Sequence, residues 1–329
     1  MIKEKISKYC NSIGLDSIGF IKCRVFEELR DFYLDRKEKG LENEFEESDI
    51  EKRINPNVYM EDGKTIISIA FPYYMGEDDI DNGFSIYTKG YDYHRVVKNY
   101  LDKVCTYIKD LGGNAVPLVD SNSLPERYIA YLAGVGIIGK NNMLITEKYG
   151  SYVFLGEIIT DLEVECEDFG TLEKVMKYEG CDSCKICIDN CPTKAIMIGR
   201  KNPNICSSYI TQKKELSTVD YELIKSRIFG CDICQNNCPY NKKINTSNLE
   251  EFTPLEFMNN NDISFYASLN NKDFKDKVSK TSCGWRGKNV IRRNAIIRLH
   301  REGEDIEKYK GDSPMINNCI EEIKKRGLL

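Results

Sequence analysis

The segment 181-CDSCKICIDNCP-192 decides the fold of the middle of this chain, because its four cysteines follow the spacing C-x-x-C-x-x-C-x-x-x-C-P. Bacterial ferredoxins hold 4Fe-4S clusters with this spacing. The first three thiolates can surround one cluster, whereas the turn carries the fourth away and, in two-cluster domains, it binds the other cluster. The segment therefore predicts a ferredoxin-like domain that holds two clusters.

A second segment, 231-CDICQNNCP-239, repeats the motif with one cysteine fewer, and Cys206 stands upstream as its replacement. The predicted ligands are Cys181, Cys184, Cys187 and Cys238 for one cluster, and Cys191, Cys206, Cys231 and Cys234 for the other. Two structural zinc sites are the alternative, which we disfavour because such sites usually pair two separated C-x-x-C knuckles. The chain has 14 cysteines, and we expect ordinary thiols at Cys10, Cys23, Cys105, Cys166, Cys283 and Cys319.

The composition is that of a folded protein with a sizeable core. With 329 residues, of which 41% are hydrophobic and 30% charged, the chain is neither disordered nor a small disulfide scaffold. The net charge of −5 excludes a uniformly basic nucleic-acid binder but allows a local basic surface. The start, MIKEKISKYCNSIGLDSIGF, does not resemble a signal peptide, and no apolar run approaches the roughly 18 residues of a membrane span. We therefore expect a cytoplasmic protein that does not enter a membrane, in which clustered thiols bind metal.

The pattern changes along the chain and predicts three domains. Residues 1–168 predict a mixed α/β (α+β) domain, 169–245 hold the cysteine motifs, and 246–329 predict a short helical C-terminal segment. The clearest local predictions are helices over 2–13, 97–111 and 289–302, and strands within 15–23, 65–74 and 151–160. In the last helix, one apolar face is formed by Ile291, Ala295, Ile296 and Leu299.

Two short motifs suggest cofactors that the surrounding sequence does not support. Residues 134–139 fit the dinucleotide pattern G-x-G-x-x-G, but a helical pattern precedes them where a strand is required. The same residues nearly fit a phosphate loop, but Asn141 lacks the hydroxyl that binds magnesium. The glycines leave two interpretations open, a close approach to a flat ligand and a plain turn. Asp92-Tyr93-His94 hints at a corrinoid D-x-H-x-x-G motif, but Val97 replaces the glycine, so His94 is by default a cap or surface group.

Four segments together resemble the epoxyqueuosine reductase family over nearly the whole chain. They are YTKGYDYHRVV at 87–97, VDSNSLPERYIAYLAGVGIIGKN at 119–141, the cysteine motifs with CSSYIT at 206–211, and WRGKNVIRRNA at 285–295. The resemblance implies an enzyme that reduces epoxyqueuosine to queuosine at the wobble position of tRNA. It implies a cobalamin-binding domain in 1–168, two 4Fe-4S clusters in 169–245 and a tRNA-contacting tail in 246–329.

The resemblance also implies roles for single residues. Asp120 falls on the family's proton donor, for which we expect a raised pKa, because burial beside an apolar cofactor disfavours the charged carboxylate. Its alternative role is to cap a helix beginning near Leu124. Ser123 stands where many relatives have proline, which puts the conformation of this loop in doubt. The cobalamin contacts implied are Arg53, His94, Asp120, Asn141, Leu144, Leu155 and Ser208.

Basic residues gather near the clusters and in the tail. The resemblance implies tRNA anticodon-loop contacts at Lys213, Arg286, Arg292 and Arg293, although a charge run is usually a solvated helix face. Trp285, the only tryptophan, could stack a base or anchor the tail.

The implied partners include an external electron donor such as flavodoxin or ferredoxin, and we expect a monomer. Two other functions are open, namely a different corrinoid reductase (dehalogenase-like or corrinoid-activating) and a plain electron carrier. The long segment before the cysteines disfavours the electron carrier.

Overall fold

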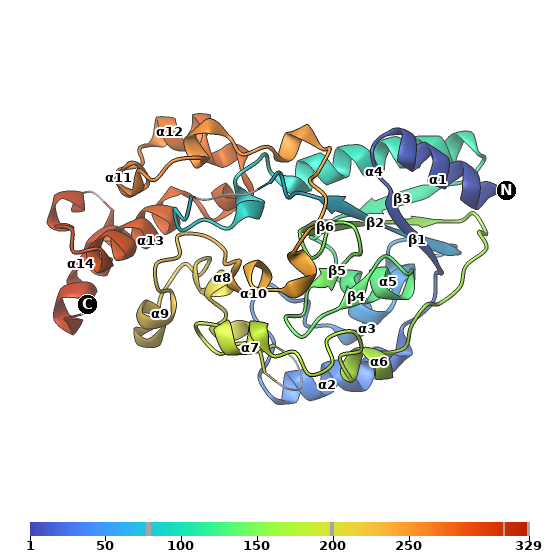
Figure 1. The fold of residues 1–329 in the computed structure, drawn as a ribbon, viewed down its shortest axis with the longest axis horizontal. Helices are drawn as coiled ribbons and strands as arrows, with labels where there is room; N and C mark the ends of the chain where they lie inside the picture. Colours follow the sequence, from blue (N-terminus) through green and yellow to red (C-terminus); the bar gives the residue numbers. More distant parts are fainter. Residues whose placement is uncertain (77–79, 198–200, 312, 328–329) are drawn as a thin grey trace.

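The computed structural model describes residues 1–76, 80–197, 201–311 and 313–327. Its N-terminal part is built on a four-stranded sheet with the strand order β1-β2-β6-β3, and every neighbouring pair is antiparallel (Figure 1). The strands are β1 (Ser17–Lys22), β2 (Thr65–Pro72), β3 (Ala115–Leu118) and β6 (Val153–Thr160). The predicted mixed class and the three predicted strands are confirmed.

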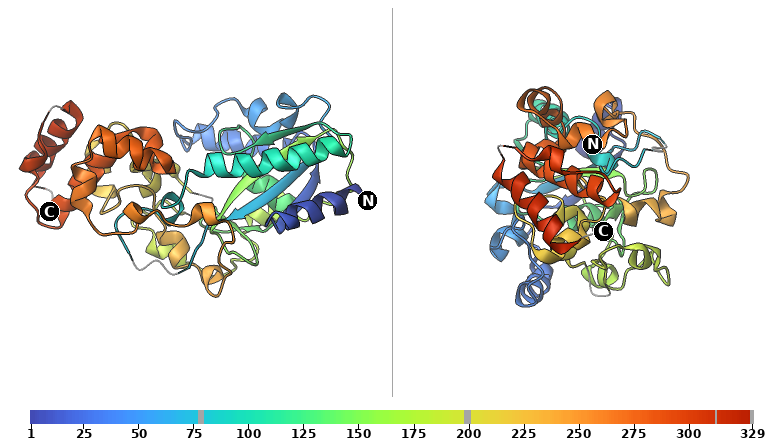
Figure 2. Two further views of the ribbon diagram at one scale, coloured as in Figure 1. Left: turned by 90° about the horizontal axis from the view of Figure 1, so that it is seen from above. Right: turned by 90° about the vertical axis from the view of Figure 1, so that its left-hand side faces the viewer.

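Helices cover both faces of this sheet, which explains why β2 is buried along its whole length. On one face lie α1 (Ile2–Ser12) and α4 (Tyr93–Asp110), whose apolar stripes join the core around Ile67 and Phe71. On the other face lies α5 (Glu126–Leu132), with α2 (Arg30–Glu38) and α3 (Ile50–Ile54) further out. Figure 1 shows the two helix layers above and below the sheet, and in the left view of Figure 2 the helix α4 crosses in front of the strands.

The glycine motif at 134–139 forms a turn. It follows α5 and leads into a small hairpin of β4 (Ile137–Ile138) and β5 (Leu144–Ile145), so no helix begins there. A Cβ at Gly136 would lie 2.4 Å from the carbonyl oxygen of Ile145. The glycine is therefore required by the close approach of the two strands, and rejection of the dinucleotide motif is confirmed.

The cysteine-rich part is a chain of short helices. They are α6 (Leu172–Met176), α7 (Ile186–Asn190), α8 (Ser207–Ile210), α9 (Thr218–Leu223) and α10 (Ile233–Asn236). Helices α7 and α10 occupy equivalent places in the two cysteine motifs, each just before a Cys-Pro pair, and lie against one another (Figure 1).

The C-terminal part packs around α13 (Lys288–Arg301), with α11 (Ile263–Ala267), α12 (Asn271–Asp276) and α14 (Pro314–Arg326) beside it. Helix α13 is buried on more than the single predicted face, because Arg293 and Asn294 are buried as well. Asn294 donates hydrogen bonds to the carbonyls of Thr211 and Ile228, which ties the helix to the cysteine-rich part. Among the residues described, no helix is long and apolar enough to cross a membrane.

Candidate active site and cysteine cavities

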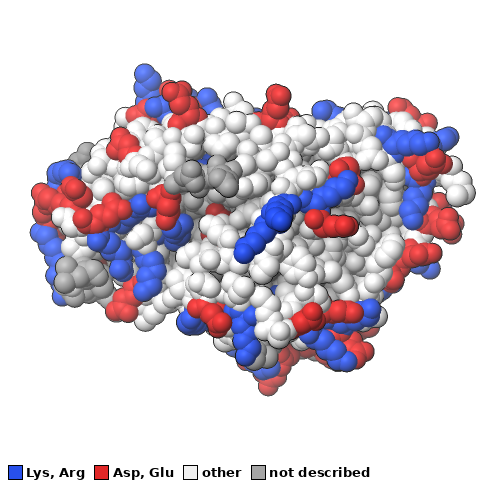
Figure 3. Space-filling view, in the orientation of Figure 1, with Lys and Arg blue, Asp and Glu red and all other residues white. Residues whose placement is uncertain are grey.

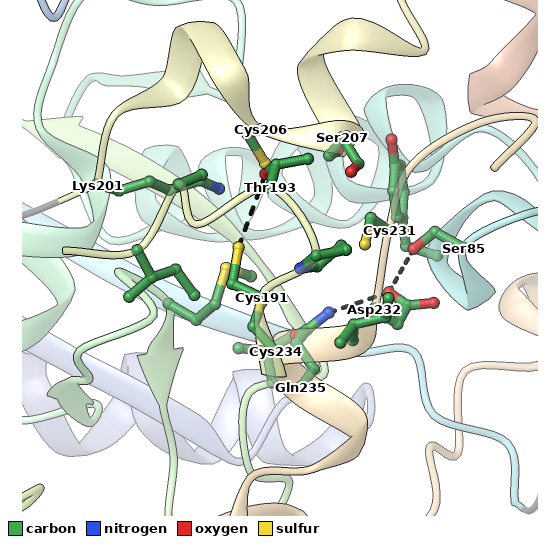
Figure 4. A pocket seen from close by; sticks show the side chains of 18 of the residues that line it. Ser85, Cys191, Thr193, Lys201, Cys206, Ser207, Cys231, Asp232, Cys234 and Gln235 are labelled. Carbon is green, nitrogen blue, oxygen red and sulfur yellow. Dashed lines mark hydrogen bonds between the residues drawn. The ribbon is translucent and has the colours of Figure 1, made fainter. Parts of the chain in front are cut away.

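The eight cysteines of the two motifs line two separate cavities. The inner cysteine cavity, of about 170 Å³, is lined by Cys191, Cys206, Cys231 and Cys234 (Figure 4). The outer cysteine cavity, of about 310 Å³, is lined by Cys181, Cys184, Cys187 and Cys238. Within the described ranges no three Cys, His, Asp or Glu side chains converge on a single metal ion, whereas the four thiolates of a 4Fe-4S cluster each bind a different iron and surround a wider space. The division into two sets of four is the one that the spacing predicts.

The surroundings of the inner cavity suit thiolate sulfur. Burial raises the pKa of the Cys191 thiol, but the N–H groups of Ile196, Thr193 and Ala195 point at its sulfur and lower the pKa overall. The ammonium group of Lys201 lies against Cys206, with a hydrogen bond between them. Hydrogen bonds to sulfur and nearby positive charge are the means by which proteins stabilise thiolate ligands of iron-sulfur clusters.

The outer cavity lies closer to the surface. Ile186 and Tyr240 line it and are 40% and 44% exposed. Lys140, from the turn after β4, donates from Nζ to the carbonyl of Cys184 at 2.9 Å. Asn141 lines the outer cavity and donates to the carbonyl of Cys234 at 3.4 Å. Asn141 therefore links the walls of the two cysteine cavities.

A much larger cavity, of about 1210 Å³, opens beside the inner one. Tyr87 and Phe154 line both, so the two cavities share a wall. The large cavity has aromatic sides, with Tyr93 stacked on Phe154 at a ring distance of 4.2 Å. It also shares Asp120 and Glu126 with a side cavity of about 390 Å³. The lining combines these rings with many polar side chains, among them Asp120 and Glu126, so the cavity can hold a ligand that has both apolar and polar surface.

His94 and Asp120 form an ion pair in the large cavity. His94 Nε2 lies 3.0 Å from Asp120 Oδ2, and its Nδ1 lies 2.8 Å from Asp92 Oδ1 at the N-terminus of α4. Burial opposes the charge on the imidazole, but the hydrogen bonds to Asp120 and Asp92 raise the pKa of His94 to about 9.

The expectation of a raised pKa at Asp120 is wrong for this structure. The side chain of Asp120 is 53% exposed, so desolvation raises its pKa only in part, and the hydrogen bond and charge of His94 outweigh this effect and lower the pKa of Asp120. The proton therefore resides on His94 at neutral pH. The helix-cap alternative for Asp120 is also wrong, because α5 begins at Glu126 with Pro125 as its cap residue.

The sequence analysis missed two acidic residues beside this pair. Glu126 accepts hydrogen bonds from the backbone N–H of Asp120 and the side chain of Asn122, and Glu157 of β6 is fully buried behind it. Burial, followed by the charge of Asp120, raises the pKa of Glu126 to about 7. A charged residue within the apolar strand VFLGEIIT is the signal that would have found Glu157.

The other residues implied for cobalamin are spread over different places. Leu155 lines the large cavity and Ser208 lines the inner cysteine cavity, whereas Leu144 is buried in β5 and lines none of these four cavities. Arg53 lines the side cavity, pairs with Glu42 and Glu46, and lies 3.8 Å from the ring centre of Tyr33.

The implied RNA contact at Arg293 is wrong. Its side chain is 2% exposed and donates to the carbonyls of Lys214 at 2.8 Å and Lys213 at 2.9 Å. A guanidinium committed to buried carbonyls cannot reach a phosphate. Lys213 is partly exposed and pairs with Asp220, and Arg292 is half-buried and donates to the carbonyl of Ala267.

Arg286 and Trp285 lie nearer the large cavity. Arg286 packs over the ring of Trp285 at 4.7 Å and pairs with Glu44. Trp285 lines the large cavity and is 55% exposed, an exposure that favours base stacking over anchoring. At the C-terminal end of the face drawn in Figure 3, Lys and Arg side chains alternate with Asp and Glu.

Two protein-family models and several curated proteins match the sequence of this chain. Residues 180–241 match the model of the 4Fe-4S double cluster binding domain, so the cysteine-rich part is that of a two-cluster iron-sulfur protein. Residues 53–121 match the model described as epoxyqueuosine reductase QueG, DUF1730. The epoxyqueuosine reductase of Lactococcus garvieae is 38% identical over 309 residues, which cover 91% of this chain and 86% of that protein. The chain belongs to the epoxyqueuosine reductase family.

Solved structures of the family share the fold. A crystal structure of epoxyqueuosine reductase with an epoxyqueuosine-modified tRNA-Tyr stem loop superposes with a TM-score of 0.87 and 32% identity, covering 98% of this chain and 93% of that chain. The Bacillus subtilis enzyme, with its catalytic aspartate loop swung out of the active site, gives a TM-score of 0.85 and 30% identity with the same coverage.

Proposed function

We propose that this protein reduces epoxyqueuosine to queuosine at the wobble position of tRNA. The observation that carries the proposal is the wall shared by the inner cysteine cavity and the large cavity, formed by Tyr87 and Phe154. This wall brings an acid-base pair, His94 and Asp120, close to a set of thiols that can hold an electron-transfer cluster. The family membership supplies the substrate.

The eight cysteines are the proposed ligands of two 4Fe-4S clusters, one in each cysteine cavity. Electrons from an external donor such as flavodoxin or ferredoxin enter at the outer cavity, where Ile186 and Tyr240 are exposed. They pass to the inner cavity across Asn141, which contacts both walls, and leave it toward the large cavity.

The large cavity is the proposed site of cobalamin. Its volume of about 1210 Å³ and its aromatic side chains suit a wide, flat macrocycle, its many polar side chains suit polar groups at the edge of that ring, and the side cavity leaves room for a substituent. Leu155 and His94 would contact the group there, and Arg53 would contact it from the side cavity. When bound, cobalamin supplies a strongly reducing metal centre, which the twenty amino acids do not provide.

The side chains of this protein handle the proton. Reduction of an epoxide to an alkene consumes two electrons and two protons, breaks both carbon-oxygen bonds of the ring and releases water. The leaving oxygen must be protonated, and Asp120 is the proposed donor. Because Asp120 is ionised beside His94, the first proton is held on His94 Nε2 and moves through Asp120 Oδ2 to the oxygen, and the second proton, which completes the water molecule, is taken up from solvent by the same pair.

The tRNA anticodon loop is the proposed macromolecular substrate. Trp285 offers an exposed ring at the mouth of the large cavity, and Arg286 lies against that ring. Aromatic stacking on an extruded base and guanidinium contacts to phosphate are the usual means of reading single-stranded RNA. Lys213 and Arg292 are proposed to contribute phosphate contacts.

Expression in a bacterial strain that lacks its own enzyme tests the proposal. Nucleoside mass spectrometry of the tRNA should detect queuosine in place of epoxyqueuosine, and unchanged epoxyqueuosine would contradict the proposal. Metal analysis of the anaerobically purified protein should find about eight iron atoms and about one cobalt atom per chain. Zinc without iron would contradict the proposed clusters.

A further inference from the structure

Glu157 lies in the centre of the sheet, where no water reaches its carboxyl group and both oxygens need a hydrogen-bond partner from the protein. It is opposite Ser68 of β2, is fully buried, and accepts a hydrogen bond from Ser68 Oγ to its Oε1 at 3.2 Å. Its Oε2 has no hydrogen-bond partner among the described residues. Burial, together with the carboxyl of Glu126, raises the pKa of Glu157 well above its ordinary value. The buried position therefore favours the neutral, protonated form of Glu157.

Glu126 connects this buried acid to the catalytic loop. Its carboxyl faces that of Glu157, and its Oε1 accepts the N–H of Asp120 at 2.9 Å and Nδ2 of Asn122 at 2.6 Å. Two carboxylates in contact repel each other, whereas one shared proton gives Glu157 Oε2 a partner and removes the repulsion.

The loop that Glu126 holds, residues 119–124, has a strained backbone. Asp120 has φ of 46°, in the left-handed region, and the N–H of Asn122 bends back to the carbonyl of Asp120 at 2.7 Å. A non-glycine residue keeps such a conformation only where its surroundings determine it. The hydrogen bonds to Glu126 on one side and the contact of Asp120 with His94 on the other are such surroundings.

We infer that Glu126 and Glu157 share one proton and act as a positioning pair that anchors the loop of residues 119–124, keeping Asp120 against His94. The catalytic importance of the anchor rests on the proposed function, but the anchor itself does not. Arg127 and Tyr93 also face Glu126, and His94 is faced by Asp92, Asp120 and Tyr93. The variants below leave Arg127, Tyr93 and Asp92 in place.

The position of the loop can be measured on His94, because the chain has only two histidines. In the oxidised holoenzyme with labelled histidine, NMR titration should give His94 a pKa of about 9. The variant Glu126→Ala removes the acceptor of both loop hydrogen bonds, so Asp120 leaves His94 and the pKa of His94 falls toward its ordinary value of 6.5. The variant Glu126→Gln keeps an oxygen acceptor and should retain the wild-type titration.

Kinetic measurements distinguish a loss of loop positioning from a general loss of folded protein. Glu126→Ala should lower kcat for a modified RNA stem loop by about tenfold or more, with KM unchanged, since misplacement of a catalytic group acts on the chemical step. Glu126→Gln should recover most of that loss. The control Glu163→Ala, on the exposed segment after β6, should change neither the titration nor kcat. An unchanged His94 titration in Glu126→Ala would overturn the inference even if the protein proved to act on another substrate.

The proton shared by Glu126 and Glu157 can be detected directly by infrared spectroscopy. Infrared spectra at mildly alkaline pH should contain the carbonyl band of a protonated carboxylic acid, and Glu157→Gln should lose that band. The amide of Glu157→Gln can still donate to Glu126, so His94 should titrate as in the wild type. If the protonated-acid band is absent from the wild type, the shared proton is refuted.

Discussion

The two cysteine cavities use the same ligand pattern at different depths. The outer cavity has exposed side chains, Ile186 and Tyr240, on its rim, whereas the inner cavity is lined by the buried Asp232 and the half-buried Lys201 and shares a wall with the large cavity. Exposure suits the point where electrons enter, and contact with the large cavity suits the point where they leave. Depth, more than ligand type, therefore distinguishes the roles of the two proposed clusters.

Removal of one cysteine from each cavity is the change with the largest expected effect. Cys234→Ala should abolish turnover with any reductant, because the inner cluster lies between the donor and the large cavity. Cys184→Ala should abolish turnover with a protein donor but leave measurable turnover with a small chemical reductant. Each variant should contain about four iron atoms in place of about eight. If both variants lost turnover with the protein donor and with the chemical reductant to the same extent, the proposed entry and exit roles of the two clusters would be wrong.

Asp120→Asn should have the next largest effect. The amide cannot pass on a proton, so kcat should fall by about 100-fold or more, the usual contribution of a general acid. Iron content should not change, because Asp120 lines neither cysteine cavity. Asp110→Asn, at the exposed C-terminal end of α4 and away from the cavities, is the matched control and should keep the wild-type kcat. If Asp120→Asn kept the wild-type kcat, Asp120 would not be the proton donor.

Two arginines of the tail should separate stability from RNA binding. Arg293→Ala leaves buried carbonyls without donors and should destabilise the protein by about 3 kcal/mol, measured by denaturant unfolding. It should not change the salt dependence of tRNA binding. Arg286→Ala should also cost stability, because its side chain is only 11% exposed, donates to the carbonyl of Gln212 and pairs with Glu44, but it should in addition reduce the slope of log affinity against log salt by about one. If Arg293→Ala instead weakened the salt dependence of tRNA binding and left stability unchanged, Arg293 would be an RNA contact after all.

The smallest expected effect is that of pH on the His94–Asp120 pair. Since folding raises the pKa of His94 from 6.5 to about 9, its contribution to stability is fully present below pH 6.5 and is lost as the pH rises through about 9. Unfolding measured across this range should reveal the loss in the wild type and a smaller loss in Asp120→Asn. Identical pH profiles would contradict the ion pair.

The cysteine region could be predicted from the sequence, whereas the acid-base site could be predicted only in part. Ligand spacing is a local property, so Cys206 and the crossover of Cys191 and Cys238 follow from the two motifs. The pKa of Asp120 depends on His94, which lies on another element, and no local pattern reports that contact. The predicted RNA contact at Arg293 was wrong for the same reason, because the carbonyls that its guanidinium binds are distant in the sequence. Glu157 gave a usable signal as a lone charge in an apolar strand.

The central claim is that an electron path and a proton donor meet in the large cavity. The most direct measurement is the conversion of an epoxyqueuosine-containing RNA stem loop by protein loaded with clusters and cobalamin and reduced chemically, followed by mass spectrometry. The wild type should yield queuosine, and Asp120→Asn should yield almost none at equal iron content. Absence of queuosine with the fully loaded wild type, or equal yields from the two proteins, would contradict it.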